Sequence, residues 1–210
     1  MKRLSRQEIA VRVAQDIPAG AIVNLGIGMP TMVTEYLNPD KEIILHSENG
    51  VLGMGPAPAA GEEDEDLINA GKQYVTLRKG GAYFNHADSF AMIRGGHIDF
   101  CILGAFQVSA TGDLANWHTN QPNAIPAVGG AMDLSVGAKQ VYVMMELFTR
   151  EGECKLVEQC TYPVTGLRCV DRVYTDIAVF DITATGGFSV REIYADITKE
   201  TLQEMCGVPL

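Results

Sequence analysis

Glu48 lies in a sequence context that suits a reactive carboxylate. It follows a short apolar run, residues 43–45 (IIL), and precedes an Asn-Gly pair, the strongest short turn signal. This pattern predicts a buried strand that ends in a turn, and ligands of open α/β sheets bind beyond the carboxyl ends of strands. We expect Gly50, Gly53 and Gly55 to let a substrate approach the backbone closely. Glu48 is therefore a candidate nucleophile, because carboxylates form covalent intermediates in some enzymes.

Asn24 interrupts an apolar strand pattern and therefore needs hydrogen-bond partners. It either orients a neighbouring carboxylate or a substrate carbonyl, or bonds only to nearby backbone, and the local sequence leaves both interpretations open. The Gly26-x-Gly28 pair that follows lacks the third glycine of a dinucleotide fingerprint, whose place holds Thr31. A tight strand-to-helix turn is therefore favoured over a dinucleotide site.

Three further positions have either a binding or a purely structural interpretation. Lys72, between a glycine and a predicted strand, is either a surface charge or a cation for an anionic ligand. Gly129 and Gly130 follow a long loop, and they either offer backbone N–H groups to an oxyanion or only form a turn. The histidines and cysteines lack metal-binding spacings, so we expect no metal site.

Composition narrows the class of protein. The chain has 210 residues and a formal net charge of -10, which argues against a nucleic-acid partner. No apolar run is long enough to span a membrane. The five cysteines have no CxxC spacing and no signal peptide precedes them, which fits a reducing cytoplasm. We expect one domain, residues 1–210, that is cytoplasmic.

The elements that would hold the candidate residues follow from capping signals and apolar periodicity. Ser5 and Glu8 form a capping box at the start of the first helix, and later helices are expected at residues 30–37 and 88–94 and after Thr198. Strands are predicted at residues 21–25, 42–46, 74–78, 98–103, 141–145, 173–182 and 190–193, with loops at 53–61 and 117–130. Helices that alternate with apolar strands predict an α/β fold whose sheet is largely parallel in its core.

Six sequence blocks, in order, carry a resemblance to a known family. Residues 45–53 (LHSENGVLG) resemble the glutamate signature of the family I coenzyme A transferases in their β-subunit form. The other blocks are residues 24–30 (NLGIGMP), 66–72 (DLINAGK), 92–97 (MIRGGH), 112–117 (GDLANW) and 129–134 (GGAMDL). The match covers nearly the whole chain, and six ordered blocks are far more specific than any one of them.

The resemblance implies a CoA-transferase fold of the NagB/RpiA-like type, with a largely parallel central sheet flanked by helices. It implies Glu48 as the catalytic nucleophile, which carries a glutamyl-CoA thioester in a ping-pong reaction. For substrate and CoA binding it points to Asn24, Asn49, Lys72, Gly129 and Gly130. No cofactor is expected, because the coenzyme A thioester is a substrate. The β-subunit form is half an enzyme, so we expect an α subunit as partner in an α2β2 heterotetramer.

Two departures within the resemblance bear on the acid substrate. His46 stands where acetoacetate-type members usually carry Gln, and residues 118–128 (HTNQPNAIPAV) lack the lysine of the acetoacetate-type loop. Both favour 3-oxoadipate, with succinyl-CoA as the donor, although no cation in the loop explains how its second carboxylate is held. We expect this long loop to keep water from the glutamyl thioester. The alternatives are an acetoacetate or short-chain acid transferase and, in another class, a non-catalytic or sugar-phosphate-binding relative.

Overall fold

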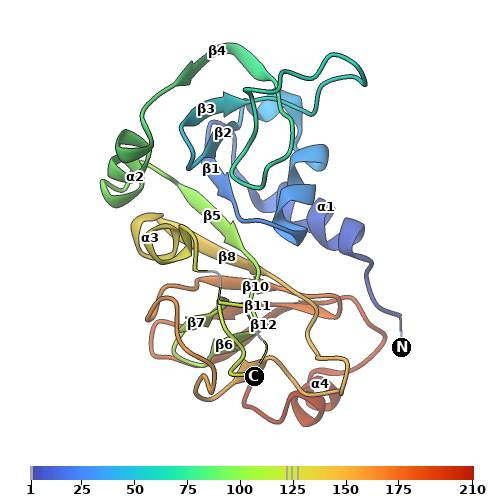
Figure 1. Ribbon diagram of the computed structural model, residues 1–210. Helices are drawn as coiled ribbons and strands as arrows, with labels where there is room; N and C mark the ends of the chain where they lie inside the picture. Colours follow the sequence, from blue (N-terminus) through green and yellow to red (C-terminus); the bar gives the residue numbers. More distant parts are fainter. Residues whose placement is uncertain (1, 122, 124, 127) are drawn as a thin grey trace.

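A nine-stranded mixed sheet dominates the computed structural model, which describes every residue except 1, 122, 124 and 127 (Figure 1). The strand order is β12-β11-β10-β8-β5-β1-β2-β3-β4. The five central strands from β10 to β2 run parallel, and antiparallel strands flank them at both edges. The predicted parallel core is therefore confirmed. The bounds are β1 Ile22–Leu25, β2 Ile44–Ser47, β3 Val51–Met54, β4 Leu77–Tyr83, β5 Phe100–Leu103, β8 Gln140–Met144, β10 Arg172–Tyr174, β11 Ala178–Ile182 and β12 Phe188–Ile193.

Helices cover both faces of the sheet. Successive strand residues point to opposite sides, so the apolar central strands present apolar side chains on both faces, and both faces need a cover. On one face, α1 (Arg6–Asp16) and the 3-10 helix η1 (Met29–Tyr36) share a core with Ile102 and Met144. On the other face, α2 (His86–Arg94) and α3 (Ala131–Gly137) share a core with Leu103 and Val143 (Figure 1). This second core also contains α4 (Lys199–Cys206) and a small sheet of β6 (Gln107–Ser109), β7 (Leu114–Ala115) and β9 (Leu156–Val157).

Capping residues place most of the predicted helices correctly. The Ser5 hydroxyl accepts the Glu8 N–H at 3.2 Å, and the Glu8 carboxylate accepts the Ser5 N–H at 2.7 Å, which confirms the capping box. Thr198 caps α4 by accepting the N–H of Thr201 at 3.3 Å. The helix expected at residues 30–37 is a 3-10 helix, η1, rather than an α-helix. Its threonines and valine are poor α-helix formers, which explains the difference.

Residues 173–182 form two antiparallel strands, not the single strand that the apolar run predicts. β10 ends at Tyr174 and β11 begins at Ala178. Thr175 closes the turn between them, because its hydroxyl accepts the N–H of Ile177 at 3.2 Å and that of Ala178 at 3.0 Å. The turn is buried and contains neither Gly nor Pro, so its sequence lacks the two strongest turn signals.

β3 and β4 also differ from the expectation, which put a loop at residues 53–61 and a strand at 74–78. β3 includes Gly53, and β4 begins only at Leu77. At Gly53, where φ is 79°, a Cβ would lie 2.9 Å from the Cα of Gly81 on β4. At Gly55 a Cβ would collide with the Thr76 hydroxyl. These glycines therefore admit the neighbouring segment of the same chain, and the expectation that they admit a substrate is wrong.

The carboxyl ends of β1, β2, β5 and β8 meet at one edge of the sheet. In the observed register Asn24 on β1 pairs with His46 on β2, and Leu103 on β5 pairs with Val143 on β8. The residues that follow these strands therefore converge on one region. Such an edge is where open α/β sheets bind their ligands.

Candidate active site

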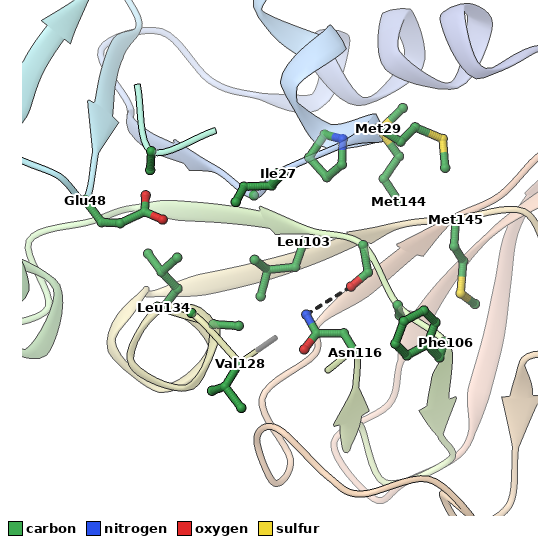
Figure 2. Close-up of a pocket in the computed structure, with 18 of the residues that line it drawn as sticks. Ile27, Met29, Glu48, Leu103, Phe106, Asn116, Val128, Leu134, Met144 and Met145 are labelled. Carbon is green, nitrogen blue, oxygen red and sulfur yellow. Dashed lines mark hydrogen bonds between the residues drawn. The ribbon is translucent and has the colours of Figure 1, made fainter. Parts of the chain in front are cut away.

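Glu48 occupies the turn between β2 and β3, so it is held at the end of a buried strand as the sequence predicts. The Gly50 N–H donates to the Ser47 carbonyl at 3.0 Å and closes the turn. Gly50 has φ of 119°, and a Cβ there would collide with the Phe84 carbonyl, so only glycine fits. The half-buried Glu48 carboxylate points toward a cavity of about 520 Å³ (Figure 2).

Asn24 orients the Glu48 carboxylate, which decides between the two interpretations of this residue. Its side chain is fully buried, and its Nδ2 donates to Glu48 Oε2 at 3.1 Å. The same nitrogen lies 3.3 Å from the His46 carbonyl oxygen and 3.1 Å from His46 Nδ1. The carboxamide therefore presents its N–H groups, and not its oxygen, to the carboxylate.

His46 supports this arrangement from the side of Asn24 that faces the protein interior, a role not predicted from its sequence context. It is 1% exposed, its ring stacks on Phe84 at 6.0 Å between centroids, and its Nε2 lies 3.0 Å from the Ser89 hydroxyl. Burial lowers the pKa of His46 to about 4, so the ring is neutral near pH 7. Because Asn24 donates to Nδ1, the ring proton belongs on Nε2, where it donates to Ser89. The sequence signal that would have indicated this role is a polar residue at the end of an apolar strand, because such a residue needs hydrogen-bond partners when it is buried.

Gly129 and Gly130 line the cavity beside Glu48. A Cβ at Gly130 would lie 3.6 Å from Glu48 Cγ and 3.2 Å from the Phe90 ring. The backbone at this position is therefore close to the carboxylate, as the oxyanion interpretation requires. Its role as a hydrogen-bond donor stays a prediction.

Asn49 and Lys72 lie outside the cavity. The exposed Asn49 side chain donates to the Ile68 carbonyl at 2.7 Å. Lys72 is exposed at a turn where its N–H donates to the Asn69 carbonyl at 2.9 Å and its φ is 63°. Neither residue lines the cavity that Glu48 lines, and the binding roles of both residues remain predictions.

The walls of the cavity are mainly apolar. Leu103, Leu134 and Met144 lie between Glu48 and the far end, where Figure 2 shows Phe106 and Met145. The Asn116 side chain donates to the Gly104 carbonyl at 3.1 Å and ties the wall together. Three charged residues, Arg6, Glu146 and Lys155, also line the cavity, and no motif in the sequence indicates them.

Part of the predicted covering loop lies outside the described residues, namely positions 122, 124 and 127. The described residues 117–121 have no regular secondary structure, and Val128 lines the cavity. Among the described residues, no group of three or more His, Cys, Asp or Glu side chains is arranged to hold a metal ion. In the same part of the chain, no helix has the length and apolar character needed to cross a membrane.

The sequence profile of the family described as Coenzyme A transferase matches residues 6–200. This match covers most of the chain. The chain therefore belongs to the coenzyme A transferase family, and it is a transferase enzyme.

Two relatives match this chain over nearly all of its length, and one solved structure shares its fold. The chain is 65% identical over 209 residues to one subunit of the 3-oxoadipate CoA-transferase of Pseudomonas putida, covering 100% of this chain and 97% of the relative. It is 58% identical to the subunit of the same name from Acinetobacter baylyi, covering 99% and 95%. An acyl-CoA transferase apoenzyme from Escherichia coli O157:H7 has a TM-score of 0.77 at 21% identity, covering 99% of this chain and 42% of that one. The structural likeness confirms the expected fold.

Proposed function

We propose that this chain is the β subunit of a CoA-transferase that moves coenzyme A from succinyl-CoA to 3-oxoadipate through a glutamyl-CoA thioester on Glu48. One observation carries the proposal: the Glu48 carboxylate faces a cavity while Asn24 donates to its Oε2 at 3.1 Å. The choice of acid is supported by the names of the two relatives at 65% and 58% identity.

The first half-reaction begins with the free Glu48 oxygen. It attacks the thioester carbonyl carbon of succinyl-CoA, the carbon–sulfur bond breaks, and CoA leaves as a thiolate from a mixed anhydride. The thiolate then attacks the glutamyl carbonyl carbon, and succinate leaves with the bridging oxygen. The product is a glutamyl-CoA thioester, which keeps the free energy that hydrolysis would lose.

The second half-reaction reverses these steps with the acceptor. A carboxylate of 3-oxoadipate attacks the glutamyl thioester carbonyl, and CoA thiolate leaves from a new mixed anhydride. The thiolate then attacks the 3-oxoadipyl carbonyl of this anhydride, so that 3-oxoadipyl-CoA forms and Glu48 leaves as the free carboxylate. Each tetrahedral intermediate carries an oxyanion. The Asn24 carboxamide and the backbone near Gly129 and Gly130 are its proposed donors, since they line or adjoin the cavity at Glu48.

Partners complete the proposal. We propose an α subunit, in an α2β2 heterotetramer, because each of the two relatives is named as one subunit of its enzyme.

Asn49 and Lys72 are exposed, which suits contact with a coenzyme that extends beyond the cavity. The reaction needs no cofactor because CoA is a substrate. We also propose that the enzyme works in the cytoplasm, without nucleic acid or membrane.

An assay of the purified chain, alone and with its α subunit, tests the proposal. We expect transfer from succinyl-CoA only when both are present, and a higher kcat/KM for 3-oxoadipate than for acetoacetate. Full activity of the chain alone would refute the split enzyme. A preference for acetoacetate would favour the rival acid, and the absence of transfer to every acid tested would favour the non-catalytic alternative.

A further inference from the structure

The cavity that holds Glu48 continues to a second end with charged side chains. Arg6, Glu146 and Lys155 line the same cavity as Glu48. Lys155 lies at the far end, because its N–H donates to the Leu147 carbonyl at 2.9 Å and its carbonyl accepts the Val108 N–H at 3.0 Å. These neighbours follow Met145 and Phe106, which Figure 2 shows on the side of the cavity away from Glu48.

The position of Lys155 is fixed by the small sheet. It immediately precedes β9, whose Leu156 pairs in parallel with Val108 on β6. Both backbone hydrogen bonds of Lys155 join it to buried segments. The base of the side chain is therefore held rigidly, while its flexible stem lets the ammonium group adjust to a ligand.

The carboxylates near Lys155 already have other partners. Glu146 forms an ion pair with Arg6 at 2.9 Å. Asp176 accepts the Leu147 N–H at 2.8 Å and lies 3.5 Å from the Arg3 guanidinium. No side-chain hydrogen bond or ion pair joins Lys155 to any residue that the structure describes.

Lys155 is thus a half-buried cation in a cavity with mainly apolar walls. Burial lowers the pKa of Lys155, and the nearby Glu146 and Asp176 carboxylates oppose this effect. A partly buried charge is costly unless something pairs with it. An anionic group bound in the cavity would supply that pair, and a perturbed titratable residue in a cleft indicates such a role.

We propose that Lys155 binds the second carboxylate of a dicarboxylic 3-oxoacid while the first carboxylate reacts at Glu48. The inference rests on the proposed function and adds the residue that selects a dicarboxylate. The mainly apolar lining of the cavity, which includes the exposed Phe106 ring, contacts the methylene groups between the two carboxylates. Lys155 also supplies the cation that residues 118–128 lack.

The test compares two acceptors in the complex with the α subunit. One acceptor is 3-oxoadipate, and the other is 3-oxohexanoate, which has the same carbon number but a methyl group in place of the second carboxylate. In a ping-pong reaction, kcat/KM for the acceptor does not depend on the donor. We expect Lys155→Met to lower kcat/KM for 3-oxoadipate about 10- to 100-fold, the effect of losing a charge-assisted hydrogen bond, and to leave 3-oxohexanoate unchanged or improved.

Two further variants control for fold and charge. Lys155→Arg should keep most of the preference for the dicarboxylate. Lys139→Met removes a surface lysine that pairs with Asp99 at 2.7 Å, near the opposite edge of the sheet, and should behave as the wild type. Circular dichroism and thermal unfolding check that each variant is folded.

Each outcome decides the proposal. An equal loss with both acids, together with weaker binding of free CoA by calorimetry, would assign Lys155 to a coenzyme phosphate and overturn the inference. Unchanged selectivity in a folded Lys155→Met complex would overturn it while leaving the CoA-transferase function in place. A wild-type complex that transfers CoA to neither acid would instead refute the proposed function, and the inference with it.

Discussion

The Glu48 carboxylate depends on a short chain of hydrogen bonds that runs inward from the cavity. Asn24 donates to Glu48, His46 offers a lone pair to Asn24, and Ser89 accepts the remaining ring proton of His46. Asn24 is the only one of these supporting side chains that touches Glu48, among the residues that the structure describes. His46 is therefore a positioning residue that acts through Asn24.

This arrangement predicts unequal and non-additive effects of mutation. Asn24→Ala removes a proposed oxyanion donor and should lower kcat about 10²- to 10³-fold. His46→Ala should lower kcat about 10-fold with little change in KM, because Asn24 loses the acceptor that sets its orientation. His46→Asn, whose Oδ1 can accept from Asn24, should recover part of this loss.

The double variant separates positioning from a general defect. If His46 acts through Asn24, His46→Ala should have no further effect on kcat in the Asn24→Ala background. Additive losses in kcat, measured by steady-state kinetics of the two-subunit complex, would contradict the positioning role.

His46 also predicts a pH dependence of stability. Its pKa is 6.5 in the unfolded chain and about 4 when buried, so between these values the unfolded state binds the proton more readily. The free energy of unfolding should therefore fall as the pH falls from about 6.5 towards 4. Urea unfolding should show a loss between about pH 7 and 5 that is about 2 kcal/mol larger for wild type than for His46→Asn. Equal losses would mean that His46 is accessible to protons in the folded state.

At the scale of the element, the turn between β2 and β3 determines where Glu48 points. Gly50→Ala should destabilise the fold by more than about 2 kcal/mol, since its Cβ would meet the Phe84 carbonyl at a φ that L-residues rarely adopt. Gly20→Ala is the matched control, because φ there is 73° and no atom lies within 4 Å of the new Cβ. We expect it to cost about 1 kcal/mol. Similar unfolding free energies of the two variants would show that the turn is not tightly packed.

The elements differ in how far the sequence predicts them. Caps and periodicity identify α1, α2 and α4, and apolar runs identify four parallel strands of the core, β1, β2, β5 and β8. The fifth, β10, is merged with β11 in one apolar run. β3 and the short strands of the small sheet escape prediction because glycines interrupt them or because they contain only two or three residues. α3 follows a glycine pair without a side-chain cap, so its start has no sequence signal.

The candidate site residues also divide into those that local sequence signals predict and those that they do not. Glu48 and Asn24 are identified by type and position, because a carboxylate at a strand end and an amide inside a strand need explanation. Lys155 is not identified in this way, because its neighbours come from segments near residues 3–6, 108, 147 and 176, and only the fold brings these segments together. Long-range placement of a single lysine has no local pattern in a sequence.

At the scale of the whole molecule, one sheet joins the two hydrophobic cores. The side chains of β5 and β8 alternate between them, so neither core can lose its strands without exposing the other. We therefore predict that residues 1–210 unfold as one domain. Circular dichroism and tryptophan fluorescence should give coincident urea transitions, whereas two separated transitions would indicate two domains.

The central claim is that Glu48 becomes covalently attached to coenzyme A, and trapping tests it most directly. The two-subunit complex is incubated with succinyl-CoA, treated with borohydride or hydroxylamine, digested and analysed by mass spectrometry. We predict that Glu48 alone is converted, to the reduced alcohol or to the hydroxamate, and that a folded, inactive Glu48→Ala complex shows no label. An active complex whose Glu48 stays unmodified, or a folded Glu48→Ala variant with full activity, would contradict the claim.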